Sequence, residues 1–124
     1  MAGLVGLGAL ITPRRVRLQV PLRLASELAP SGVWAFPEHG VAVVTTAEGA
    51  AILSMTCTHL GCRLRPVGRE LVCPCHHGRF DMAGRVLEGP PSRDLDWLAG
   101  GVDAQGMLFV LPDAIDRSRR PIAI

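Results

Sequence analysis

The chain has 124 residues, of which 48% are hydrophobic, and this is enough for one domain with a buried core. Its formal net charge is only +2, so we expect no nucleic-acid partner. All thirteen basic residues are arginine, and lysine, asparagine and tyrosine are absent, a bias that a GC-rich genome produces.

The N-terminal segment, residues 1–15, is apolar at first and then basic. Leu4–Ile11 is glycine-rich and apolar, and Pro13–Arg15 ends the run. A membrane-spanning helix needs about 20 apolar residues, and this run is shorter. It also lacks the basic start of a signal peptide. We expect either a disordered or surface-packed tail, or the last turns of a membrane anchor followed by a hinge.

Residues 16–124 are predicted to form one all-β domain. Short apolar or β-branched runs recur between Gly, Pro and Asp, which favours a small antiparallel β-sandwich or barrel. Ser26 is expected to cap a short helical turn. Hairpin turns are expected at Ser31–Gly32, Glu38–Gly40 and Ala104–Gly106. The predicted strands are Val16–Val20, Val33–Phe36, Val41–Thr46, Ala50–Met55, Glu70–Val72, Arg85–Leu87 and Met107–Leu111.

Cysteine and histidine gather in two short segments. Cys57–Cys62 reads CTHLGC, and after ten further residues Cys73–Gly78 reads CPCHHG. All four cysteines and three of the four histidines lie in these two segments. A core that used these residues only for packing would scatter them along the chain. The clustering indicates metal or redox chemistry.

The spacing of the two segments argues against zinc. Zinc sites with mixed ligands normally use paired Cys-x-x-Cys knuckles, or Cys-x-x-Cys with His-x-x-x-His. Neither pattern occurs here, and each segment instead supplies one Cys, one His and one further Cys. This arrangement resembles the Rieske iron–sulfur family, whose signature is Cys-Thr-His-Leu-Gly-Cys with Cys-Pro-Cys-His. The resemblance extends through Arg79–Asp81 to Gly89, Pro90 and Pro91, which are similar to the family's proline loop.

The resemblance implies one 2Fe–2S cluster within a two-loop cluster-binding subdomain of about residues 55–91. Cys57 and Cys73 would be thiolate ligands of the inner iron. His59 and His76 would bind the outer iron through one ring nitrogen and keep the other free, as the quinol-facing groups. Replacing two thiolates by neutral imidazoles raises the reduction potential well above that of all-cysteine clusters.

The family likeness also implies a disulfide between Cys62 and Cys75, which would join the two loops. Such a bond requires an oxidising compartment, which places the protein on the periplasmic side of a bacterial membrane. Rieske ferredoxins of ring-hydroxylating dioxygenases lack these two cysteines. The pair therefore favours the high-potential branch of the family over a free ferredoxin.

Three positions near the cluster depart from the family pattern. His77 stands where the family usually has Gly, and the Cys-x-x-His spacing makes His76 rather than His77 the ligand. Gly78 and Phe80 stand where high-potential members usually have Ser and Tyr, whose hydroxyls bond to cluster sulfur. Codon bias against tyrosine explains Phe80 but not Gly78. Losing both donors should lower the potential, which suits menaquinol rather than ubiquinol.

The function implied by the resemblance is one-electron transfer in a cytochrome bc-type complex, a quinol–cytochrome c oxidoreductase. The partners would be quinol, cytochrome b and a c-type cytochrome, with membrane association through the complex or an anchor. Leu60, beside His59, would seat the head against the quinol pocket. The alternative is the electron-transfer small subunit of a periplasmic molybdenum oxidoreductase of the arsenite-oxidase kind, which binds no quinol.

Overall fold

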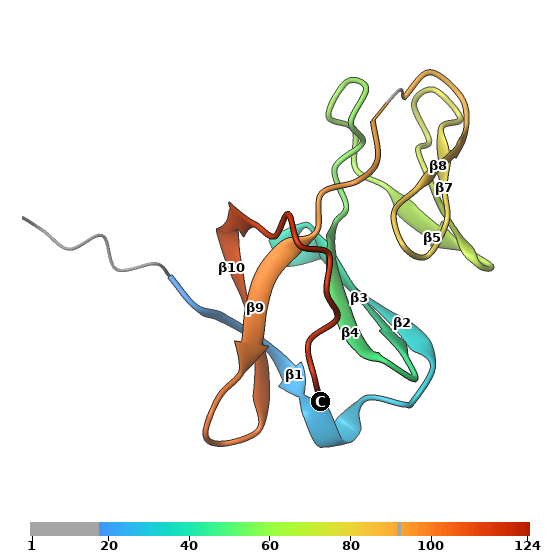
Figure 1. The fold of residues 1–124 in the computed structure, drawn as a ribbon. Helices are drawn as coiled ribbons and strands as arrows, with labels where there is room; N and C mark the ends of the chain where they lie inside the picture. Colours follow the sequence, from blue (N-terminus) through green and yellow to red (C-terminus); the bar gives the residue numbers. More distant parts are fainter. Residues whose placement is uncertain (1–17, 92) are drawn as a thin grey trace, which may run out of the picture.

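A computed structural model describes residues 18–91 and 93–124, and within them the chain forms three antiparallel β-sheets (Figure 1). The all-β prediction is confirmed, and the described residues contain no closed barrel. The sheet orders are β1(Val20–Leu24)–β10(Met107–Ile115)–β9(Leu98–Val102), β2(Gly32–Phe36)–β3(Val41–Thr46)–β4(Gly49–Ser54) and β5(Arg65–Val67)–β6(Glu70–Val72)–β7(Arg79–Phe80)–β8(Val86–Glu88). Residues 1–15, predicted to be a tail or anchor remnant, lie outside the described part.

The middle sheet carries the core on both of its faces. Val43 and Ile52 pack against Leu108 of the first sheet. On the opposite face, Leu53 packs into a second core with Leu71 of the third sheet. Nearly every side chain of β3 and β4 is therefore buried, which explains their continuous apolar runs. This sandwich is the base on which the third sheet stands.

The predicted strands agree with the structure at β2, β3, β4, β6, β8 and β10, within a few residues at their ends. Of the strand predicted at Val16–Val20, residues 16 and 17 lie outside the described part. The prediction is wrong at Leu18 and Gln19, because β1 begins only at Val20 and continues through Pro21 to Leu24. Pro21 donates no backbone hydrogen bond, and proline is for this reason found mainly in edge strands. It is tolerated because β1 is the edge strand of its sheet and its pairing with β10 is irregular there.

Two predicted turns also need correction. The helical turn η1(Ala25–Glu27) exists, but Leu24 precedes it and no side chain caps it, so Ser26 is not the cap. Ser31–Gly32 does not close a hairpin, because β1 pairs with β10 rather than with β2. The hairpin at Glu38–Gly40 is confirmed and contains the turn η2(Pro37–His39), which ends in Gly40 with a φ of 65°.

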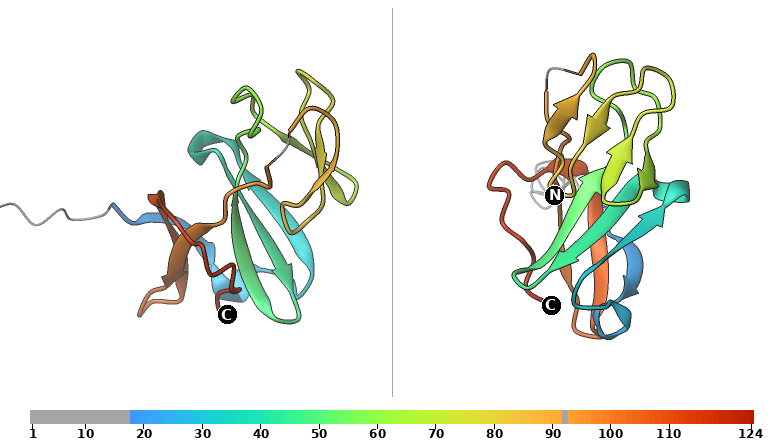
Figure 2. Two further views of the ribbon diagram at one scale, coloured as in Figure 1. Left: turned by 45° about the horizontal axis from the view of Figure 1, so that its top comes forward. Right: turned by 90° about the vertical axis from the view of Figure 1, so that its right-hand side faces the viewer.

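Three loops lie together at the end of the molecule opposite the C-terminus (Figure 2). Loop 1, residues 55–64, joins β4 to β5, and loop 2, residues 73–78, joins β6 to β7. The third is the proline loop, Gly89–Pro91, which follows β8. Within the residues that the structure describes, no helix is long and apolar enough to span a membrane.

Candidate metal centre

Loop 1 is closed by its own backbone. The Cys57 N–H donates to the Cys62 carbonyl at 2.7 Å, and the Gly61 N–H donates back to the Cys57 carbonyl at 3.0 Å. Gly61 has a φ of 76°, the left-handed conformation that glycine adopts without strain. This closure buries Cys57 and turns His59 and Leu60 outward, and Leu60 is 65% exposed.

Loop 2 repeats the same pattern of hydrogen bonds. The Cys73 N–H donates to the Gly78 carbonyl at 2.7 Å, and the His77 N–H donates to the Cys73 carbonyl at 3.0 Å. His77 takes the place that Gly61 has in loop 1, and its φ is 57°. The family's glycine at this position therefore has a conformational reason, and His77 adopts the same backbone with a side chain.

Cys57 and Cys73 are free thiols, 2% and 0% exposed, that lie close enough to interact with each other. Burial, together with the neighbouring Cys73, raises the pKa of Cys57. Burial also acts on Cys73, but it is outweighed by the backbone N–H groups of His76 and Cys75 and by the Cys57 thiol, so the pKa of Cys73 is lowered. In both loops, backbone N–H groups act to lower the pKa of the buried cysteine, towards the thiolate form that a metal ligand needs.

His59 and His76 face each other across the two loops. Their ring centroids are 4.9 Å apart and the rings are nearly perpendicular, at 87°. Within the described residues, Nδ1 of His76 is the one buried side-chain nitrogen or oxygen without a hydrogen-bond partner. A buried polar atom of this kind normally has a partner. Two thiols and two imidazoles, one with an unpartnered buried nitrogen, fit the donor set that a Rieske cluster requires.

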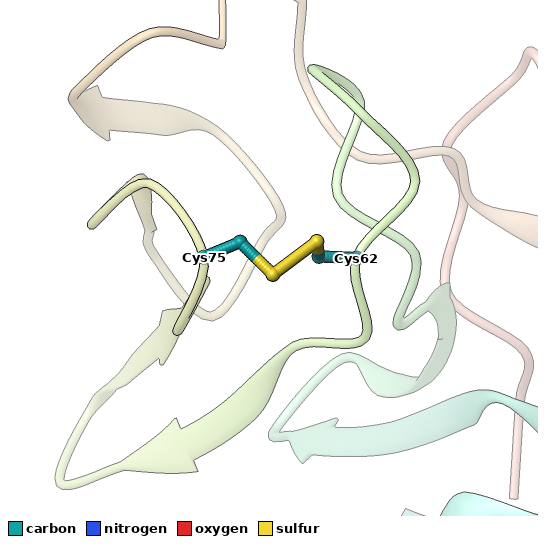
Figure 3. The surroundings of a disulfide bond; sticks show 2 residues. All are labelled: Cys62 and Cys75. Atoms are coloured by element: carbon teal, nitrogen blue, oxygen red, sulfur yellow. A yellow bond between two sulfur atoms is a disulfide. The ribbon is translucent and has the colours of Figure 1, made fainter.

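The structure joins Cys62 and Cys75 in a disulfide, with Cα atoms 6.4 Å apart (Figure 3). The predicted pairing is therefore confirmed. Sγ of Cys73 lies within 4.8 Å of both disulfide sulfurs. These three sulfurs alone would resemble a metal site, but a disulfide sulfur carries no thiolate charge. Cys57 and Cys73 remain as the two cysteines available to iron.

The family model of the Rieske [2Fe-2S] domain matches residues 20–99, more than half of the chain. The chain belongs to the Rieske [2Fe–2S] family. Such a domain binds one 2Fe–2S cluster, and the cysteines here are positioned to bind it. Which four side chains ligate the irons stays a prediction, with Cys57, His59, Cys73 and His76 as the set.

Several Rieske subunits are similar to this chain. A Haloferax mediterranei protein named as a Rieske subunit of a respiratory nitrate reductase is 41% identical over 52% of this chain. Cytochrome b6-f complex iron-sulfur subunits of Synechococcus sp. (strain JA-2-3B'a(2-13)) and Chlorobaculum thiosulfatiphilum are 39% and 34% identical over 46% and 64% of the chain. The matched segments span only 31%, 34% and 45% of these three relatives.

Two solved structures share the fold. The plasma-membrane Rieske protein PetC3 from Synechocystis PCC 6803 has a TM-score of 0.55 and 29% identity, over 75% of this chain and 97% of that protein. A chain from the oxygenase–ferredoxin complex of carbazole 1,9a-dioxygenase has a TM-score of 0.56 and 21% identity, over 80% of this chain and 97% of its own length. The second likeness concerns the fold alone.

The proline loop of this Rieske domain lies directly on loop 2. A Cβ atom built on Gly89, whose φ is 100°, would be 2.7 Å from the Gly78 Cα, so the two glycine backbones touch. A Cβ on Gly78 would be 2.8 Å from Cγ of Pro91. The Thr58 hydroxyl donates to the Arg93 carbonyl at 2.6 Å and ties loop 1 to the segment after the proline loop. Glycine at position 78 therefore has a packing reason that the sequence did not show.

Phe80 and Pro91 are buried, whereas Pro90 and His77 are exposed. Phe80 is 0% exposed and belongs to the core that also contains Cys57 and Cys73. A side chain at position 80 thus lies in the same packed layer as both free thiols. This location is compatible with the family's placement of a tyrosine hydroxyl near a ligand thiolate.

The sequence analysis missed an ionic clamp at the base of loop 2. Arg79 donates from Nε and one terminal nitrogen to the two carboxylate oxygens of Glu70, and from its other terminal nitrogen to Glu88. These bonds connect β6, β7 and β8 across the sheet. The Arg79 hydrogen bond lowers the pKa of Glu70 below its ordinary value. Only the strand register brings these charges together, because Glu70 and Glu88 are nine residues on either side of Arg79.

Proposed function

We propose that this chain is the Rieske subunit of a cytochrome bc-type complex, on the periplasmic side of a bacterial membrane. In this role it takes one electron from quinol and passes it to a c-type cytochrome. The observation that carries the proposal is the outward position of His59 beside Leu60, which is 65% exposed. An exposed leucine next to a predicted ligand imidazole provides an apolar contact where a quinol pocket would receive the head.

The residues at the tip of the cluster-binding loops, His59, Leu60 and His76, would have different roles in quinol oxidation. When bound, the cluster supplies one-electron acceptance. Nδ1 of His76 faces the buried side, which leaves Nε2 of the same ring for contacts away from the core. An outward ring nitrogen of His59 or His76 would accept the hydrogen bond of a quinol hydroxyl and then its proton. Leu60 would exclude water from this hydrogen bond by packing against the pocket wall.

Further features support the periplasmic location, menaquinol as the electron donor and cytochromes as partners. The disulfide between Cys62 and Cys75 is stable in an oxidising compartment, as the periplasm is. Gly78 and Phe80 offer no hydroxyl to cluster sulfur, so the potential should be lower than in members with Ser and Tyr, which favours menaquinol. Relatives named as cytochrome b6-f iron-sulfur subunits support cytochrome partners.

A second candidate is the electron-transfer small subunit of a periplasmic molybdenum oxidoreductase. The likeness to the Haloferax mediterranei protein named for a respiratory nitrate reductase favours it. In that role the domain would relay electrons inside a fixed assembly and would bind no quinol. The exposed Leu60 would then contact a protein subunit rather than a quinol pocket.

The native complex distinguishes the two roles. We expect it to contain b-type haem, and we expect added menaquinol to reduce the cluster, as followed by electron paramagnetic resonance. Leu60→Asp should slow this reduction at least tenfold by placing a charge in the apolar contact. Val67→Asp is the matched control, because Val67 is 58% exposed on β5 of the same subdomain and outside the three loops. Molybdenum in place of b haem, with no reduction by menaquinol, would refute the proposal.

A further inference from the structure

A groove of about 500 Å³ lies beside the cluster-binding loops, and neither His59 nor Leu60 lines it. We call it the side groove. Val41, Met55 and Leu64 line it and are buried, so its floor is apolar. Ala35 and Pro37, both exposed, come from β2 and η2 of the base. The side groove thus lies where the sandwich meets the cluster loops.

The wall nearest the cluster is the disulfide. Cys62, Pro74 and Cys75 line the side groove, and Cys75 is exposed. Sγ of Cys73, a predicted ligand of the inner iron, lies within 4.8 Å of both disulfide sulfurs. A molecule in the side groove would therefore lie against the disulfide that borders Cys73, and it would not contact His59, which does not line the groove.

The rim of the side groove is positively charged. Arg63 and Arg65 line it and are exposed, and in the described part of the chain neither forms an ion pair. A Cβ built on Gly40 would lie 1.8 Å from one terminal nitrogen of Arg63, so this guanidinium rests against the Gly40 backbone. No acidic residue lines the side groove. An apolar floor with a cationic rim suits an apolar side chain flanked by carboxylates.

We propose that the side groove is a second docking face, and that its occupant is an acidic one-electron carrier protein. The carrier places an apolar side chain on the floor and carboxylates against Arg63 and Arg65. One electron leaves the reduced cluster and enters the oxidised centre of the carrier, which is the oxidant. No bond is made or broken, and the disulfide stays oxidised. This proposal rests on the electron-transfer role of the Rieske domain. It does not depend on quinol as the partner, because the carrier would not contact the tip at His59 and Leu60.

The test uses an acidic soluble c-type cytochrome as the probe and the cluster-loaded chain. With both proteins oxidised, calorimetry gives the dissociation constant at low ionic strength. Arg63→Gln combined with Arg65→Gln should raise this constant about tenfold and lower its salt dependence. Arg69→Gln combined with Arg85→Gln removes the same charge from two exposed arginines outside the side groove, and should raise it less than about threefold. Ala35→Glu should weaken binding with both rim arginines kept.

Two results from the comparison between variants would overturn the proposal. In one, the two arginine pairs weaken binding equally, so that only net charge matters. In the other, Leu60→Asp abolishes binding while the side-groove variants bind normally, so that the carrier uses the tip. Absence of binding to the unchanged protein would also refute it. Unchanged iron content and resonance spectra would show that a variant folds. If the variant with Arg63→Gln does not fold, Ala35→Glu still tests the side groove, because it leaves both rim arginines in place. Reduction by menaquinol, measured separately, reports on the proposed function alone.

Discussion

Gly78 allows a test that separates packing from redox tuning. A Cβ at this position would be 2.8 Å and 2.9 Å from Cγ and Cδ of Pro91. Carbon atoms in contact are separated by about 3.5 Å, so Pro91 must retreat by about 0.7 Å in any variant with a side chain. Overpacking of this kind typically destabilises by about 1–3 kcal/mol. We therefore expect Gly78→Ala to destabilise the proline loop by that amount.

Gly78→Ser places the same Cβ atom against Pro91 as Gly78→Ala does, and it adds a hydroxyl. A hydrogen bond to a charged acceptor contributes roughly 1.5–3 kcal/mol, and only the part that strengthens on reduction changes the potential. For a one-electron couple, about 1.4 kcal/mol corresponds to about 59 mV. We expect Gly78→Ser to have a potential some tens of millivolts above that of Gly78→Ala, because the two differ by the donor alone. Protein-film voltammetry measures both potentials, and thermal loss of the cluster's visible absorption measures the packing effect.

The comparison can fail in two separable ways. Equal potentials in Gly78→Ser and Gly78→Ala would show that this position supplies no hydrogen bond to sulfur, and the argument for menaquinol would lose its main support. A Gly78→Ala protein as stable as the unchanged chain would show that Pro91 moves freely. In that case the contact between the proline loop and Gly78 would not stabilise the site.

Three further changes test the site. His76→Ala should abolish cluster assembly whereas His77→Ala should retain it, as measured by iron content; the reverse result would show that the ligand assignment is wrong. Cys62→Ser opens the disulfide, whose cysteines are 13 residues apart, and should destabilise the loaded protein by about 3 kcal/mol in thermal unfolding. Glu70→Gln removes a carboxylate whose pKa Arg79 lowers from 4.5, so its stabilisation is present above pH 4.5 and disappears as pH falls through the lowered value. The difference in unfolding free energy between Glu70→Gln and the unchanged chain should therefore vanish in acid, and a difference that persists there would contradict an ionic role.

The strands that could be predicted are those in which the pattern of apolar residues follows the pattern of burial. β3 was predicted at its observed bounds because both its faces are buried, which leaves an uninterrupted run of valine, alanine and threonine. β7 contains only Arg79 and Phe80, and two residues show no periodicity. β5 has exposed side chains throughout and includes Pro66, so its composition resembles a loop. Such short strands depend on partners from elsewhere in the chain, which a local pattern does not contain.

The metal centre was predictable to the extent that its chemistry is local in the sequence. Each loop holds its cysteines and histidines within a few residues, so their clustering alone indicated metal or redox chemistry. The ligand set and the disulfide partners followed from the resemblance to the family. The contact between Gly78 and Gly89 and the clamp around Arg79 were not predictable, because both depend on how β7 and β8 pair. These tertiary contacts position the loops, while the local motif supplies the predicted ligands.

The two loops share one pattern of backbone hydrogen bonds although their sequences differ. In both, the first cysteine donates to the carbonyl five residues later and accepts from the N–H four residues later. Loop 1 places Gly61 at the left-handed position, but loop 2 places His77 there, which costs roughly 1–2 kcal/mol. The conformation persists because the Cys73–Gly78 hydrogen bond and the disulfide at Cys75 fix the backbone on both sides of His77. In each loop the shared hydrogen-bond pattern encloses one buried cysteine sulfur, and different residues occupy its left-handed position.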